Sequence, residues 1–275
     1  CTNLEKIAIP SDLTVIESLA FFYCGSLSDI SLPSGLKIIK DTAFSNCVSL
    51  TSICLPDGLT KIDEFAFFEC RNLSDITIPN SLEFIGKEAF NACAIEHIEI
   101  PVGVKRIEDG TFWRCNKLKS VTIFGDITYI GEEAFHGAGI GSVDIPESVT
   151  FIGPNAFANT NLEKVEIPYG IDIIDSATFS GCTRLTEVVL PDTVTCISEW
   201  AFSGCSNLKS INIPNELTII EQSAFAGCGS LTDIIIPDSV TTIGKDAFAG
   251  TNINSEGEPD TKPDNENEDD DITNP

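Results

Sequence analysis

Apolar and polar positions recur with a fixed period along almost the whole chain. From Cys24 the sequence reads CGSLSDISLPSGLKIIKDTAFSN, and from Cys47 it reads CVSLTSICLPDGLTKIDEFAFFE. The shared template is C-x-x-L-x-x-I-x-I/L-P-x-x-L/V-x-x-I-x-x-x-A-F-x-x, in copies of 22 or 23 residues. Such regularity predicts a repeat protein. Eleven copies, here called repeats 1 to 11, begin at Cys1, Cys24, Cys47, Cys70, Cys93, Cys115, Ala138, Thr160, Cys182, Cys205 and Cys228.

The first half of a repeat predicts a short β-strand and a turn. Ile30, Ser31 and Leu32 alternate between apolar and polar with period two, which is typical of a strand. Pro33 and Gly35 follow at once and indicate a turn that ends the strand.

The second half of a repeat leaves no room for a long helix. Ile85, Ala89 and Cys93 are four residues apart, a spacing that places them on one face of a helical turn or two. Because one repeat buries its apolar positions only against its neighbours, we expect stacked coils with a continuous parallel sheet, roughly 50 Å long at about 4.8 Å per coil. The sequence therefore predicts a β-dominant solenoid of the α/β class. It has one short strand per coil and short helical or irregular turns on the other side.

The motif SLTSICLPDGLTKIDEFAFFEC resembles the BspA-like leucine-rich repeats of bacterial and protozoan surface proteins. The resemblance covers about 250 of the 275 residues. It implies a leucine-rich-repeat solenoid, usually part of a larger exported protein, with an extracellular or cell-surface location and a role in adhesion. It implies no catalytic residue. Departures from the template cluster in the middle, where Ala138 and Thr160 replace Cys, Phe124 replaces Pro, and the three 22-residue repeats occur.

The repeats predict a domain over residues 1–253, since Thr251, Asn252 and Ile253 resemble the start of a twelfth repeat. Residues 254–275 carry nine acidic residues and one Lys, with almost no apolar side chain. This composition predicts a disordered acidic linker. The run Asp269–Asp271 lacks the loop spacing of a calcium site.

Charge and composition exclude several classes of function. With 42 acidic and 16 basic residues the formal charge is −26, which argues against nucleic acid or an anionic membrane surface as partner. No apolar run approaches the roughly 18 residues of a membrane-spanning helix, so no direct membrane insertion is expected. The opening residues, CTNLEKIAIP, lack the pattern of a signal peptide, and a chain that begins at Cys1 is expected to be a fragment or a processed form.

Nine of the eleven cysteines occupy the first position of a repeat. Equivalent residues of stacked coils point the same way at about 4.8 Å, whereas a disulfide needs about 2.05 Å between converging side chains. The sequence therefore predicts a ladder of buried thiols, and the absence of C-x2-C pairs argues against a zinc site. Cys54 and Cys196 lie at outward positions and are candidates for reactive thiols, although an ordinary surface role is the favoured interpretation.

Two surfaces are candidates for partner binding. The outward positions of the first strands carry a mainly acidic set in repeats 5 to 8, and the alternative interpretation is a solvated sheet face. A second column follows the A-F pair and holds aromatic residues in alternate early repeats, with packing on the convex side as the alternative. The first set is His97, Glu99, Asp144, Lys164 and Glu166, and the second is Phe22, Phe68 and Trp113.

The sequence favours a non-catalytic interaction module. Carboxylates of Asp144 and Glu166, one coil apart, approach the separation of a retaining glycosidase, yet an open sheet face lacks the pocket that tunes one of them into an acid. No nucleophile, zinc or phosphate-loop motif is present, and no metal or cofactor is expected. We expect an adhesin-like module that binds a host, matrix or other surface protein, or a glycan, in an oligomeric state that the sequence leaves open. The alternative is a passive spacer that presents another domain.

Overall fold

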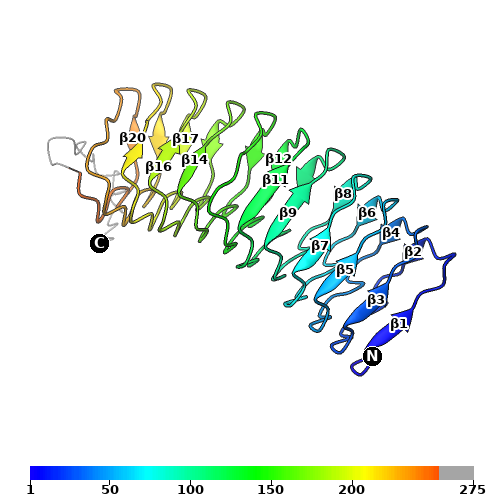
Figure 1. Cartoon of the computed structure of the whole chain (residues 1–275). Helices are drawn as coiled ribbons and strands as arrows, with labels where there is room; N and C mark the ends of the chain where they lie inside the picture. Colours follow the sequence, from blue (N-terminus) through cyan, green and yellow to red (C-terminus); the bar gives the residue numbers. More distant parts are fainter. Residues whose placement is uncertain (254–275) are drawn as a thin grey trace, which may run out of the picture.

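The computed structural model describes residues 1–253, and the acidic linker expected over residues 254–275 lies outside the described residues. The chain winds into a gently curved stack of coils, with the N-terminal coil at one end and the C-terminal coil at the other (Figure 1). The solenoid predicted from the repeat is confirmed.

The first strand of a repeat lies where apolar and polar residues alternate. Its central residue points into the core and its flanking residues are exposed, as in Asp29–Ser31, where only Ile30 is buried. Pairing is parallel between equivalent residues, so Lys6 lies opposite Asp29 and Ile7 opposite Ile30. The first strands are β1 (Lys6–Ala8), β3 (Asp29–Ser31), β5 (Ser52–Cys54), β7 (Asp75–Thr77), β9 (His97–Ile100), β11 (Ser120–Ile123), β14 (Lys164–Glu166), β16 (Glu187–Val189) and β18 (Ser210–Ile211).

Every repeat also forms a second strand of two residues after the Pro turn. The sequence pattern did not predict this element, because two residues are too few to show a period. The second strands are β2 (Val15–Ile16), β4 (Ile38–Ile39), β6 (Lys61–Ile62), β8 (Phe84–Ile85), β10 (Arg106–Ile107), β12 (Tyr129–Ile130), β13 (Phe151–Ile152), β15 (Ile173–Ile174), β17 (Cys196–Ile197), β19 (Ile219–Ile220) and β20 (Thr242–Ile243).

The parallel sheet is not continuous, in contrast to the expectation from the repeat. The first strands form four groups, β1-β3, β5-β7, β9-β11 and β14-β16-β18. The second strands form three, β2-β4-β6-β8, β10-β12-β13 and β15-β17-β19-β20. Both series are interrupted in the middle of the solenoid, and repeat 7 has no first strand.

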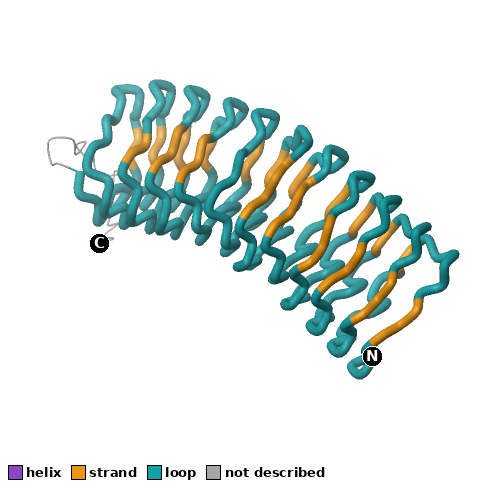
Figure 2. The backbone as a smooth tube through the Cα atoms, in the orientation of Figure 1, coloured by secondary structure: helices purple, strands orange, loops and turns teal. Residues whose placement is uncertain are grey.

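The A-F segment forms turns, and no helix occurs in residues 1–253 (Figure 2). The helical turn expected for Ile85, Ala89 and Cys93 is therefore wrong. Left-handed backbone at Glu88 and Ala92, with φ of 52° and 56°, ends any helical path. Alternate N–H groups instead bond to the next coil, as in Phe90 to the carbonyl of Thr111 at 3.0 Å. A helix is about 10 Å across, so a helix in every coil would separate the coils more widely than two series of strands paired at about 4.8 Å permit.

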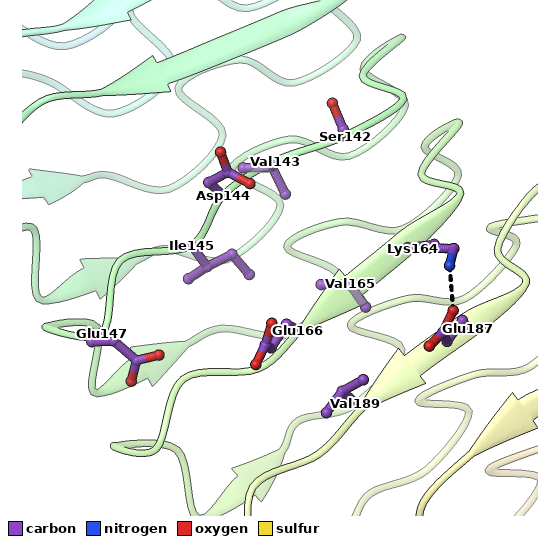
Figure 3. Close-up of a pocket in the computed structure, with 10 residues that line it drawn as sticks. All are labelled: Ser142, Val143, Asp144, Ile145, Glu147, Lys164, Val165, Glu166, Glu187 and Val189. Carbon is purple, nitrogen blue, oxygen red and sulfur yellow. Dashed lines mark ion pairs between the residues drawn. The ribbon is translucent and has the colours of Figure 1, made fainter.

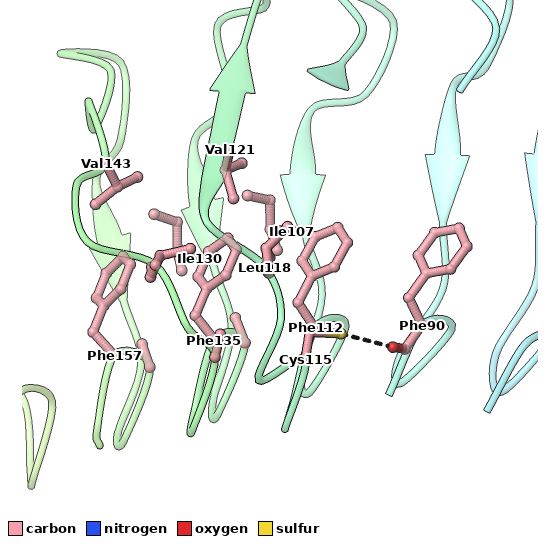
Figure 4. Packing of buried hydrophobic residues seen from close by; sticks show 14 of the residues in the cluster. Phe90, Ile107, Phe112, Cys115, Leu118, Val121, Ile130, Phe135, Val143 and Phe157 are labelled. Atoms are coloured by element: carbon pink, nitrogen blue, oxygen red, sulfur yellow. Dashed lines mark hydrogen bonds between the residues drawn. The ribbon is translucent and has the colours of Figure 1, made fainter. Parts of the chain in front are cut away.

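The phenylalanine of each A-F pair forms a continuous stack along the core. Adjacent ring centroids are 5.1 to 5.8 Å apart with interplanar angles of 2° to 13°, from Phe21 to Phe248. Figure 4 shows part of this stack against the apolar residues of both strands. Stacking at one coil's spacing joins each repeat to its neighbours.

The predicted ladder of buried thiols is confirmed. All eleven cysteines are free, and eight of the nine at first positions are buried, whereas Cys1 is exposed. Seven of these thiols donate a hydrogen bond to the carbonyl of a core phenylalanine 25 or 26 residues earlier in the chain, as Cys115 does to Phe90 at 3.0 Å (Figure 4). In repeat 8, Thr160 takes the place of the thiol and donates to the carbonyl of Phe157 at 2.8 Å.

Candidate functional site

The outward acidic residues lie in two places rather than one. His97 and Glu99 are exposed on β9, opposite Ser120 and Thr122 of β11. The Nδ1 atom of His97 lies 2.7 Å from the hydroxyl oxygen of Ser120. These residues belong to the β9-β11 group, on the N-terminal side of the interruption at repeat 7.

Asp144, Lys164 and Glu166 line one groove of about 440 Å³ over repeats 7 to 9 (Figure 3). Glu147 and Glu187 also border it, and its floor consists of aliphatic side chains such as Val143 and Val165. The structure therefore brings three of the five predicted residues of the acidic set together and leaves His97 and Glu99 outside.

The groove lies at the interruption of the first sheet. Repeat 7 begins with the residues AGIGSVDIP. Its corner, the segment that leads from the A-F segment into the first strand, is one residue shorter than in the 23-residue repeats. Residues 142–144 form no strand and pair with neither β11 nor β14, and the groove lies over them.

The charge of the groove is negative. Lys164 forms an ion pair with Glu187 at 2.5 Å, and the side chains are 71% and 41% exposed, so the pair contributes little stability. Among the described residues, Asp144 and Glu166 have no ion-pair partner. Glu147 accepts a hydrogen bond from the backbone N–H of Tyr169 at 3.3 Å. The free carboxylates are suited to accept hydrogen bonds from cationic groups.

The three aromatic residues predicted as a stripe lie in separate pairs. Phe22 packs edge-on against Tyr23, with ring centroids 4.6 Å apart, and it is 40% exposed. Phe68 packs against Phe65, with ring centroids 5.8 Å apart. The intervening repeats carry Ser45 and Asn91 at this position, both buried, so no aromatic side chain joins one pair to the next.

Trp113 forms a third pair with His136, with ring centroids 6.3 Å apart. The guanidinium of Arg114 lies 4.7 Å from the Trp113 ring. Burial lowers the pKa of His136. The Nε1 atom of Trp113 and the Nδ1 atom of His136 are buried without a hydrogen-bond partner among the described residues. Trp113 therefore packs into the solenoid more than it faces solvent.

A further column of side chains, not expected from the sequence pattern, lies on the second strands. The Nζ atom of Lys61 lies 5.3 Å from the centroid of the Phe84 ring, and the guanidinium carbon of Arg106 lies 3.6 Å from the centroid of the Tyr129 ring. The Tyr129 ring in turn stacks on the Phe151 ring, with centroids 4.8 Å apart. Burial and the nearby Asp109 raise the pKa of Tyr129. The signal was present at the position before the second-strand isoleucine, which alternates between cationic and aromatic residues in repeats 3 to 6 and is aromatic again in repeat 7.

The model of the BspA type leucine-rich repeat region matches six copies over residues 1–101, 37–160 and 150–261. The chain belongs to the BspA-type leucine-rich repeat family. Repeats of this family are typically non-enzymatic scaffolds for protein interactions. No curated protein matches the chain at a significant level of similarity.

Solved structures of other leucine-rich repeat proteins resemble this BspA-type solenoid. A leucine-rich repeat protein from Bacteroides ovatus is 30% identical, with a TM-score of 0.69 over 91% of this chain and 77% of its own. A leucine-rich cell surface protein from Faecalibacterium prausnitzii is 29% identical, with a TM-score of 0.57 over 92% of this chain and 87% of its own. The pneumococcal vaccine antigen PcpA, 22% identical over 90% of this chain and 70% of its own, shares the fold with a TM-score of 0.57.

Within residues 1–253 the solenoid contains no group of His, Cys, Asp or Glu side chains arranged to hold a metal ion. The same residues include no helix of the length and hydropathy that a bilayer crossing requires.

Proposed function

We propose that this BspA-type solenoid is a non-catalytic, adhesin-like interaction module of a cell-surface or secreted protein, and that the groove over repeats 7 to 9 binds a basic segment of a protein partner. The observation that carries the proposal is the groove itself. It lies at the one internal repeat, among the described coils, that lacks its first strand, and Asp144 and Glu166 border it without ion-pair partners.

Several features support a protein partner over a glycan. The groove combines carboxylates with an aliphatic floor, which suits an extended segment of Lys or Arg and apolar residues. No aromatic side chain lines it to stack against a sugar ring. The acidic solenoid steers a cationic partner toward itself by long-range attraction. The cell-surface location rests on the family and on the resemblance to the leucine-rich cell surface protein from Faecalibacterium prausnitzii.

The test is the binding of an extended peptide of alternating Lys and Leu to the immobilised full chain. We expect saturable binding that weakens as salt rises, because exposed charges are screened. The variant Asp144→Asn with Glu166→Gln removes two charges without changing side-chain size, and affinity should fall at least about tenfold. The matched control, Asp12→Asn with Glu216→Gln, removes two exposed charges that do not line the groove and should bind like the unchanged chain.

Two results would contradict this assignment. Equal losses in both variants would show that the peptide responds only to net charge. A failure to bind this peptide, together with no interaction across panels of surface proteins and glycans, would favour the passive spacer.

A further inference from the structure

The corners that lead from the A-F segment into the first strand differ between long and short repeats. In the eight 23-residue repeats, the template Leu donates its N–H to the carbonyl of the first residue of the repeat, three positions earlier, at 2.8 to 3.2 Å. The three 22-residue repeats lack one residue between these positions, and Ile95, Ile140 and Leu162 do not form this bond. The loss of one residue therefore removes a whole turn from the corner.

Only the short corner of repeat 5 lies between two complete corners. Repeats 7 and 8 are both short and adjacent, so each has a short corner on one side. Repeat 5 instead has the full corners of repeats 4 and 6 on its two sides. A single missing turn between two complete ones leaves an open notch on the surface. The notch has a volume of about 430 Å³, within the usual range for small-molecule sites.

The floor of the notch is small and its walls are cationic. Ala92, Cys93 and Ala94 line the floor, and neither alanine fills the space that the missing turn leaves. Arg71 projects from one wall, and Arg114 and Lys117 come from the other. In a chain of formal charge −26, three cations around one hollow reverse the local sign of the charge.

The charges nearby leave most of this positive potential uncompensated. Glu69 is the one acidic residue of the lining and pairs with Arg71, so the lining carries a net charge of +2. Glu96 is paired at 2.6 Å with Lys119. Arg114 and Lys117 have no ion-pair partner among the described residues. The face of Trp113 holds the guanidinium of Arg114 at 4.7 Å and limits its freedom.

We propose that this notch is a binding site for a tetrahedral oxyanion, the phosphate or sulfate group of a larger ligand. Guanidinium groups donate paired hydrogen bonds to such oxygens, and a group of up to two negative charges matches the net charge of the lining. The site is separate from the acidic groove, which lies on the sheet face of repeats 7 to 9 and favours cations.

The experiment is an amide NMR titration of the full chain with inorganic phosphate and with sulfate, at constant ionic strength maintained by chloride. We expect saturable shifts at Ala94 and Arg114. A sugar phosphate and a sulfated disaccharide, titrated in parallel, then identify which ester the notch prefers. No saturable shift with either inorganic anion would overturn the proposal.

Variants separate the notch from a general effect of charge. Arg71→Gln with Arg114→Gln should weaken binding at least about tenfold, since each lost guanidinium removes charge-assisted hydrogen bonds. Arg184→Gln is the matched control, because Arg184 occupies in repeat 9 the corner position that Lys117 occupies in repeat 6, and it should leave affinity unchanged. Equal weakening in both would overturn the site.

Two further variants test the shape and sign of the notch. Insertion of one Asn between Ala94 and Ile95 restores the 23-residue corner, fills the notch and should abolish binding with no change in charge. Glu69→Gln frees Arg71 from its partner and should tighten binding. Weaker binding to Glu69→Gln, in a chain with an unchanged thermal transition, would contradict the inference even where the insertion variant fails to fold.

Discussion

The ladder of buried thiols makes the solenoid sensitive to alkaline pH. Burial raises the pKa of Cys47, Cys115 and Cys228 from 9.0 to about 12, and it raises the pKa of Cys70, Cys93, Cys182 and Cys205 as well. The folded state therefore holds these thiols protonated, whereas the unfolded chain releases their protons above about pH 9. Their contribution to stability is intact below the unfolded-state pKa and is lost as pH rises toward the folded-state values.

The magnitude follows from the number of thiols. One pH unit above the unfolded-state pKa, each buried thiol favours unfolding by on the order of 1 kcal/mol. The six thiols whose pKa rises furthest together oppose folding by on the order of 10 kcal/mol, which is comparable to the whole stability of a typical domain; they are Cys47, Cys70, Cys93, Cys115, Cys205 and Cys228. We expect the solenoid to unfold near pH 10.

The assay is urea denaturation followed by far-ultraviolet circular dichroism at a series of pH values from 7 to 10. The informative quantity is the slope of the free energy of unfolding against pH, because a cavity left by substitution shifts the free energy equally at every pH. The double variant Cys93→Ala with Cys115→Ala should reduce that slope above pH 9 by the contribution of two of the buried thiols. Alanine is tolerated at this position, as Ala138 is buried in repeat 7. The control Cys54→Ala, at an exposed thiol, should leave the slope unchanged. An unchanged slope in the double variant would refute the reasoning.

Three other predictions follow from the packing. At pH 8, Ellman's reagent should modify the exposed Cys1 and Cys54 rapidly and Cys196 more slowly, since burial raises the pKa of Cys196. After denaturation all eleven cysteines should react, and a smaller number would contradict the assignment of free thiols. Phe112→Ala, between stacked neighbours at 5.8 and 5.4 Å, should lower the free energy of unfolding by about 3–5 kcal/mol, and Phe21→Ala, with one stacked neighbour, by less. Trp200→Gly should raise the melting temperature, because Trp200 is exposed and has a left-handed backbone conformation with φ of 55°, which costs about 1 kcal/mol for any residue other than glycine. A lower melting temperature would contradict this prediction and show that contacts of the indole ring stabilise the fold.

The regular features of the fold were predictable from the sequence because translation relates the coils. Once the period is known, a residue at one position lies against the same position of the next repeat, and this places the Cys ladder without any coordinates. The burial of Ile30 between two exposed neighbours on β3 follows in the same way from alternation. These predictions need only the period and the spacing of strands.

The turns on the other side were not predictable by the same means. The spacing of Ile85, Ala89 and Cys93 satisfies a helix, and nothing in that local pattern excludes one. The exclusion comes from stacking, since a helix in every repeat would separate the coils more widely than two sheets of paired strands permit. The left-handed backbone at Glu88 and Ala92 is a consequence of that competition, and neither residue type signals it.

The two candidate sites depend on a further relation that the sequence contains but a single repeat does not show. Loss of one corner residue has different consequences in repeats 5 and 7, although both lose the same turn. In repeat 5 the complete corners on both sides border an open notch beside Arg71 and Arg114. In repeat 7 the next corner is also short, the first strand fails to pair, and the opening lies beside Asp144 and Glu166. A hollow of about 350 Å³ also lies on the outward face of repeats 3 and 4, which both follow the 23-residue template, so a short corner is not needed for every hollow. At the two candidate sites, however, the shape of the opening depends on whether the neighbouring coils also depart from the template.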